Sequence, residues 1–80
     1  MNYILLTTTS CPKCPAMKEF VRENLAKFSG EIWDETKPNF LDKARELGIT
    51  SVPVLIFFDN GKEIFRGSEP YEAEDFLATL

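Results

Sequence analysis

Two cysteines separated by two residues are the strongest chemical signal in this chain. They form the segment Cys11-Pro12-Lys13-Cys14, and the chain contains no other cysteine and no histidine. A thiolate attacks a disulfide to form a mixed disulfide, which a neighbouring thiol then resolves. We therefore predict a thiol–disulfide oxidoreductase, with Cys11 as the catalytic nucleophile and Cys14 as the catalytic resolving cysteine.

The segment lies where a strand is expected to lead into a helix. The apolar and β-branched run from Tyr3 to Thr8 predicts a buried strand. We expect Cys11 to be the N-cap and Pro12 the first residue of the helix, because proline is tolerated at that position. The helix dipole and the charge of Lys13 would then favour a thiolate at Cys11. Pro15 predicts a distorted first turn, which is either a tuned sulfur environment or a tolerated proline. The apolar face of this helix comprises Met17, Phe20, Val21, Leu25 and Phe28, and Ser29-Gly30 is expected to end it.

The remaining pattern predicts three further strands and two further helices. The apolar residues of the helices are Phe40, Leu41, Ala44 and Leu47, ending at Gly48, and, after Pro70, Ala73, Phe76, Leu77 and Leu80. The strands are Glu31 to Thr36, Val52 to Phe58 and Glu63 to Arg66, the last two joined by the hairpin signal Asp59-Asn60-Gly61-Lys62. The order βαβαββα predicts an α/β fold with a mixed four-stranded sheet flanked by helices. We expect residues 1–80 to form a single domain.

Composition and charge restrict the classes of binding partner that we expect. The formal charge is −4, and the nine Lys and Arg residues are scattered, so a nucleic-acid surface is not expected. The amino terminus has no basic leader, and its apolar run is too short for a signal peptide or a membrane span. We expect a cytoplasmic monomer that binds no cofactor, metal or membrane. In that compartment paired cysteines are more often catalytic or metal-binding than structural.

Other uses of two cysteines remain open alternatives. A structural disulfide over so short a loop would constrain little chain entropy. A zinc site or an iron–sulfur cluster would need two further ligands, and therefore a second copy of the chain. An interaction domain that merely keeps a redox fold is a further possibility.

These residues resemble the thioredoxin superfamily over nearly the whole chain. The resemblance rests on Cys11-Pro12-Lys13-Cys14 after the first strand, on Val52-Pro53 at the third strand and on the hairpin from Phe58 to Glu63. The chain looks most like the compact glutaredoxin-like thioredoxins of archaea and anaerobic bacteria. The resemblance implies a thioredoxin-like fold and a cis peptide bond before Pro53, which would pack against the cysteine pair. It also implies that Pro12, Lys13, Val52 and Pro53 contact the substrate, with the Val52 backbone bonding an extended peptide.

The chain departs from both branches of that superfamily. Glutaredoxins commonly have Tyr in the active-site motif and Thr before Val-Pro, where this chain has Lys13 and Ser51. Their Gly-Gly-Asp-like segment after the fourth strand is replaced by Gly67-Ser68-Glu69. Thioredoxins usually have Trp before the motif, where this chain has Ser10. We therefore expect a thioredoxin-like electron carrier that reduces protein disulfides and receives electrons from a thioredoxin-reductase-like donor. A glutathione-dependent glutaredoxin is the alternative.

Overall fold

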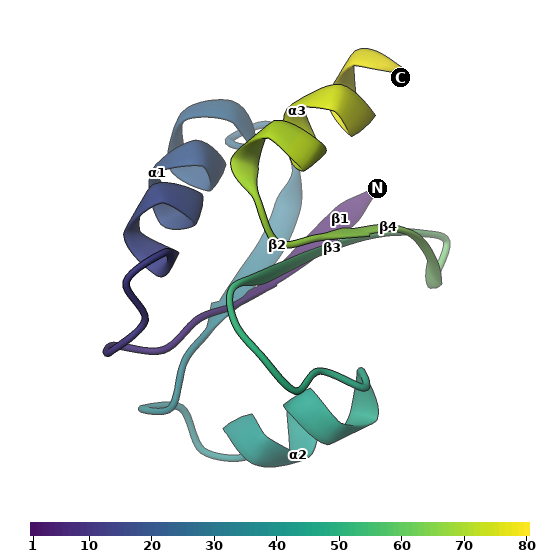
Figure 1. The fold of residues 1–80 in the computed structure, drawn as a ribbon. Coiled ribbons are helices and arrows are strands. Elements are labelled where there is room, and N and C mark those ends of the chain that lie inside the picture. The colour runs from purple at the N-terminus through teal and green to yellow at the C-terminus, as the bar shows by residue number, and fades with distance from the viewer.

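A four-stranded mixed sheet with three helices is the framework of the molecule (Figure 1). The computed structural model describes residues 1–80. In chain order the elements are β1 (Asn2–Leu6), α1 (Cys14–Asn24), β2 (Ser29–Trp33), α2 (Phe40–Glu46), β3 (Val54–Asp59), β4 (Lys62–Gly67) and α3 (Pro70–Ala78). The spatial order of the strands is β2-β1-β3-β4. β1 runs parallel to β2 and antiparallel to β3, and β3 runs antiparallel to β4. The predicted fold class is confirmed.

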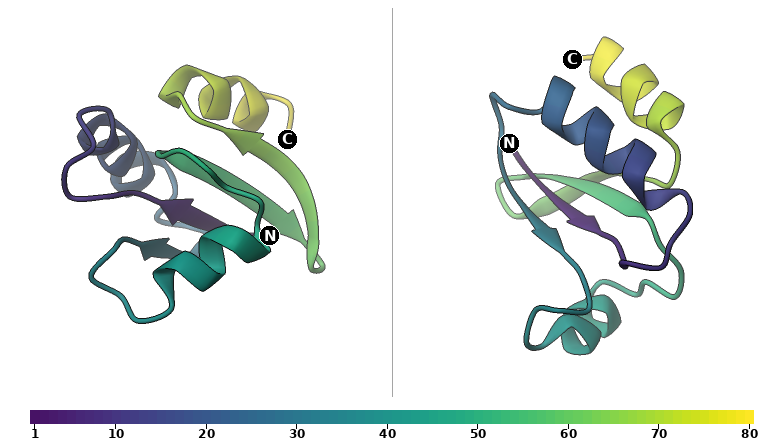
Figure 2. Two further views of the ribbon diagram at one scale, coloured as in Figure 1. Left: turned by 60° about the horizontal axis from the view of Figure 1, so that its bottom comes forward. Right: turned by 90° about the vertical axis from the view of Figure 1, so that its left-hand side faces the viewer.

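The two faces of the sheet are covered unequally. α1 and α3 lie side by side on one face, and α2 lies on the other (Figure 2). The main core, under α1 and α3, contains Leu5, Met17, Phe20, Val21, Leu25, Leu55, Phe57 and Ala73. α2 has only seven residues, none of them fully buried, and Leu41 is 67 % exposed. The cysteine segment leads into α1, so it is attached to the better-packed of the two helical layers.

Helix α1 is shorter than the sequence indicated. Its apolar face is buried as predicted, but the helix ends at Asn24, and Phe28 lies beyond it, where its N–H donates to the carbonyl of Leu25. The predicted stop at Ser29-Gly30 was wrong, because both residues already belong to β2. The strand predicted from Glu31 to Thr36 is present, but it begins at Ser29 and ends at Trp33. Gly30 pairs with Tyr3, and a Cβ on Gly30 would clash with the Tyr3 ring. Pairing with β1 therefore begins β2 at Ser29, two residues before the start that the sequence pattern predicted.

The turn signals predicted the right local structure. Asn60 and Gly61 both have positive φ, 53° and 81°, as a two-residue type I′ hairpin requires. Gly48 has φ 70° and ends α2. The N–H of Gly48 donates to Arg45 and that of Ile49 to Ala44, which satisfies two carbonyls at the helix end.

Strand pairing brings four connections to one edge of the sheet. Leu6, the last residue of β1, is opposite Val54, the first residue of β3. Leu6 also pairs with Trp33 at the end of β2, and Leu55 pairs with Gly67 at the end of β4. The loops that leave or enter the sheet at these positions must therefore lie near one another. The cysteine segment is part of the first of these connections.

Candidate active site

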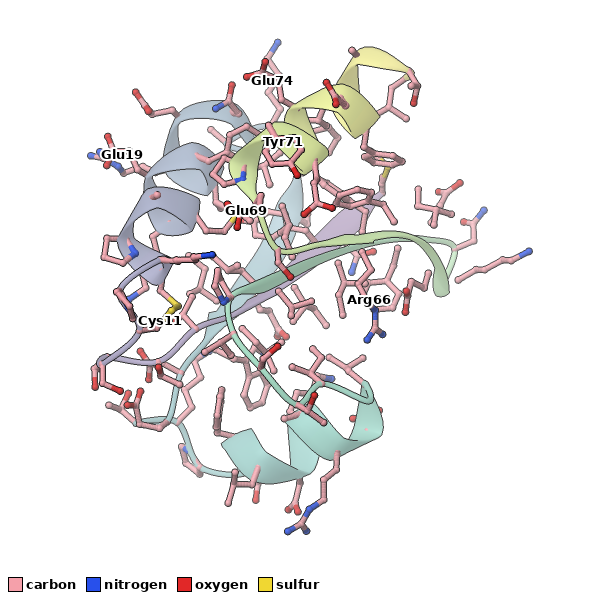
Figure 3. The ribbon with its side chains drawn as sticks, viewed as in Figure 1. Cys11, Glu19, Arg66, Glu69, Tyr71 and Glu74 are labelled. Carbon is pink, nitrogen blue, oxygen red and sulfur yellow. A yellow bond between two sulfur atoms is a disulfide. The ribbon has the colours of Figure 1, made fainter.

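Cys11 and Cys14 form a disulfide at the connection between β1 and α1 (Figure 3). Their Cα atoms are 5.4 Å apart. Cys14 is the first residue of α1 and is 1 % exposed, whereas Cys11 lies in the preceding loop and is only partly buried. The two sulfurs thus differ in access, because an incoming molecule can reach Cys11 while protein atoms cover Cys14.

The helix begins later than the sequence predicted. Cys11 was expected as the N-cap and Pro12 as the first helical residue, but the N-cap is Lys13. Pro15 has no N–H and so cannot donate to the Cys11 carbonyl as a helix would require. The N–H of Cys14 instead donates to that carbonyl at 3.4 Å and closes a turn. Cys11 therefore precedes the helix, and Cys14 begins it.

Val52 lies directly beside the accessible cysteine. The Val52 carbonyl oxygen is 3.7 Å from Cys11 Sγ, a separation at which the reduced thiol would donate to it. The Val52–Pro53 peptide bond is cis, as the family resemblance implied. Pro53 is buried and Val52 is partly buried. The antiparallel pairing of β1 and β3 brings these residues, 41 positions apart in sequence, into contact.

Lys13, which lies between the two cysteines, forms an ion pair. Its ammonium is 3.3 Å from Oε1 of Glu69, the N-cap residue of α3. The side chain of Glu72 accepts hydrogen bonds from the N–H groups of Ser68 and Glu69, each at 3.0 Å. The local positive charge expected from Lys13 is therefore balanced by a carboxylate from the opposite end of the chain.

The loop before Cys11 is tied to the end of β2. Thr9 donates its N–H to both carboxylate oxygens of Glu35, at 2.9 and 3.1 Å, and its hydroxyl to one of them at 2.7 Å. The bond from the Thr9 hydroxyl is the main reason that the pKa of Glu35 lies below its usual value. In the same region the buried Thr7 donates its N–H and its hydroxyl to the Trp33 carbonyl. These contacts hold the segment that carries Cys11 against the sheet.

Residues 1–78 match the family model described as the thioredoxin domain. The chain belongs to the thioredoxin domain family. This membership and the Cys11–Cys14 disulfide make the protein a thiol–disulfide oxidoreductase with a redox-active pair. The predicted superfamily is confirmed. The comparison with curated protein sequences found no match.

Solved thioredoxin structures share the fold of this thioredoxin domain. Thioredoxin O2 from Arabidopsis thaliana is 18 % identical, with a TM-score of 0.86 over 99 % of this chain and 73 % of that one. A thioredoxin-like protein from Clostridium perfringens is 22 % identical, with a TM-score of 0.71 over 99 % of this chain and 69 % of its own. Thioredoxin 1 from Thermosipho africanus is 17 % identical, with a TM-score of 0.69, and 97 % of its chain is covered.

The structure brings the predicted site residues of this thioredoxin domain to one edge of the sheet. Pro12 and Lys13 are exposed between the cysteines, and Val52 lies against Cys11. Their roles in binding substrate stay predictions. Sequence reasoning missed Glu69 and Glu35, although Glu69-Pro70-Tyr71-Glu72 carries a helix-start signal, with a proline at the first position and a Glu at the third. Nothing local to Glu35 indicated its partner 26 positions away.

Two further observations concern the molecule as a whole. No helix is long and apolar enough to cross a membrane. The Cys, Asp and Glu side chains form no group of three or more arranged to hold a metal ion.

Proposed function

We propose that the protein reduces disulfides in other proteins, with Cys11 attacking and Cys14 resolving. The observation that carries the proposal is the difference in access between the two sulfurs: Cys11 is partly exposed beside the Val52 carbonyl, while Cys14 is 1 % exposed. An intermolecular attack needs an accessible sulfur, and the resolving step needs one held close by.

The reaction cycle starts from the dithiol. The Cys11 thiolate attacks one sulfur of a substrate disulfide, forming a mixed disulfide and releasing the other substrate sulfur as a thiolate, which takes up a proton. Cys14 then loses its proton and attacks Cys11 Sγ, which releases the second substrate thiol and forms the Cys11–Cys14 disulfide found in this structure. The substrate gains two electrons and two protons, and a dithiol donor must return both to the protein.

The surroundings of Cys11 suit an extended peptide. The Val52 backbone lies beside Cys11 and precedes β3, so a substrate segment can align with it as an added strand. Next to Val52 there is an open hollow of about 190 Å³, lined largely by the apolar residues Phe40, Leu41, Ala44 and Ile49. We infer that this hollow receives an apolar substrate side chain, while the exposed Pro12 and Lys13 contact the peptide from the other side and the buried Pro53 fixes the Val52 carbonyl.

The charges near Cys11 favour a protein dithiol over glutathione as the electron donor. Glutathione carries two carboxylates, which need cationic or N–H partners. The N–H groups of Ser68 and Glu69 are already donated to Glu72, and Lys13 is paired with Glu69. An incoming anion would have to displace a carboxylate from each of these donors. We therefore propose a thioredoxin-reductase-like donor.

Turnover of insulin disulfides tests the assignment of the cysteines. Cys11→Ser should abolish reduction, whereas Cys14→Ser should accumulate a mixed disulfide through Cys11 that is detectable by mass spectrometry under non-reducing conditions. Full activity of Cys11→Ser would contradict the proposal. The donor is tested separately by supplying NADPH with thioredoxin reductase or with glutathione and glutathione reductase. Faster turnover with glutathione would replace the proposed donor with the glutaredoxin alternative.

A further inference from the structure

The ion pair between Lys13 and Glu69 joins the cysteine segment to the start of α3. The two residues are 56 positions apart in sequence, and the Lys13 nitrogen lies 3.3 Å from the Glu69 carboxylate. The side chains are 72 % and 37 % exposed, and exposed pairs of this kind add little to stability. The pair is therefore better placed to influence the chemistry of Cys11 than to hold the fold together.

The charged groups around Cys11 come from several elements. The α2–β3 connection brings only uncharged residues near the sulfur: Thr50, Ser51 and Val52. The charged groups held against the neighbouring segments are Lys13 in the cysteine segment, Glu69 and Glu72 at the start of α3, and Glu35, bonded to Thr9. Asp34 lies beside Glu35, and Lys18 and Lys37 are close enough to act on it. Lys13 is the cation that lies between the two cysteines in the chain, so its position affects how much attraction a thiolate at Cys11 experiences.

We propose that Glu69 is a positioning residue that holds the Lys13 ammonium in this ion pair and so limits how strongly Lys13 stabilises the Cys11 thiolate. The inference rests on the proposed role of Cys11 as the attacking thiolate. A flexible lysine that is free of its partner can approach a nearby anion, whereas a lysine bound to a carboxylate presents a nearly neutral pair. Glu69 would thus keep the reduced form slightly less stable, and the reduction potential slightly lower, than an unpaired Lys13 would.

Glu69→Gln removes the charge and leaves the start of α3 in place. The Glu69 side chain accepts from the Glu72 N–H in a capping box, and a glutamine amide oxygen can accept the same bond. The backbone carbonyl of residue 69 still accepts from the Glu72 N–H, and the Glu72 side chain still accepts from residues 68 and 69. Glu74→Gln is the matched control, since it removes the same charge from the same helix. Glu74 takes part in none of the ion pairs and lies further along α3 (Figure 3). Lys13→Gln removes the cation itself from an exposed position.

The first readout is the rate at which iodoacetamide alkylates Cys11 in the reduced protein, followed from pH 5 to pH 10. Glu69→Gln should lower the pKa of Cys11 by about half a unit, or about threefold in its ionisation constant, the size expected for one solvent-screened charge. Glu74→Gln should leave the pKa unchanged. In the Lys13→Gln background, Glu69→Gln should produce less than half of that shift, because Lys13 is no longer there to be released.

The second readout is the reduction potential, measured against dithiothreitol buffers as a function of pH. A threefold gain in the stability of the thiolate form corresponds to a rise of about 14 mV, at about 30 mV per factor of ten. The rise should be present above the pKa of Cys11, vanish below it, and shrink in 1 M NaCl. A change in structure alone would not follow that titration.

Two outcomes would overturn the inference. One is an equal effect of Glu69→Gln and Glu74→Gln on the pKa of Cys11. The other is an unchanged effect of Glu69→Gln in the Lys13→Gln background, which would show that the carboxylate acts only by its own field. Failure of the proposed function looks different, because Cys11→Ser would then still reduce insulin whatever the Glu69 variants do.

Discussion

Phe57 should be a residue on which the packing of α1 and α3 against the sheet strongly depends. Its side chain is fully buried in β3 and contacts four other rings, those of Tyr3, Phe28, Phe65 and Phe76, with ring centroids 5.2 to 6.3 Å apart. The same core cluster includes three residues of α1 after Cys14: Met17, Phe20 and Val21. Removing the Phe57 ring should therefore loosen the layer that covers Cys14.

The expected loss of stability depends on how much of the buried side chain is removed. Phe57→Ala removes a fully buried ring, and such changes cost about 3–5 kcal/mol. A domain of this size is stable by about 4–12 kcal/mol, at about 0.05–0.15 kcal/mol per residue, so the alanine variant should be marginal. Phe57→Leu keeps most of the apolar volume and loses ring–ring contacts worth about 0.5–1.5 kcal/mol each. Four such contacts would sum to about 2–6 kcal/mol, and because energies of neighbouring contacts do not simply add, we expect a loss near the lower bound, about 2 kcal/mol, or roughly 8–16 °C of melting temperature.

Urea unfolding of Phe57→Leu, followed by circular dichroism, measures this loss. Phe58→Leu is the matched control, because Phe58 is next on β3, points to the opposite face and is only partly buried. It should lose less than half as much. Alkylation of Cys14 in the reduced protein should also be faster in Phe57→Leu than in the control. Equal losses of stability in the two variants would refute the argument that the α1 and α3 layer is the main core.

Three further predictions concern strand β2, the hairpin turn between β3 and β4, and the loop before Cys11. Gly30→Ala should lower the free energy of unfolding by about 1–3 kcal/mol, because its Cβ would meet the Tyr3 ring, and Gly30→Ala with Tyr3→Ala should recover part of the loss; no recovery would contradict this. Gly61→Ala should cost about 1–2 kcal/mol through its positive φ, measured by thermal unfolding, and an unchanged midpoint would refute it. Glu35 has a lowered pKa in the folded protein because Thr9 bonds to its carboxylate, so its contribution is complete above pH 4.5 and is lost as pH falls through the folded value. Glu35→Gln should therefore flatten the acid limb of a stability–pH curve, and an identical limb would exclude this link.

Much of the fold was determined by local sequence signals. The two positive-φ residues at Asn60-Gly61 specified the hairpin, and Gly48 specified the end of α2. These succeed because they depend on the backbone preferences of one or two residues. The predicted boundaries of α1 and β2 were wrong, because the pairing of Ser29 and Gly30 with β1 overrides the apolar pattern.

The sequence by itself predicted the chemistry of this protein, because Cys11 and Cys14 lie three positions apart, and the turn at the start of α1 brings their Cα atoms to 5.4 Å, a separation that a disulfide can span. It could not determine which neighbours those sulfurs have. Val52 reaches Cys11 through antiparallel pairing, and Glu69 reaches Lys13 through the placement of α3. Both contacts join residues that are far apart in the sequence, so they form only when the sheet and α3 are assembled. Only the tertiary structure therefore decided that the lysine beside the disulfide is already paired.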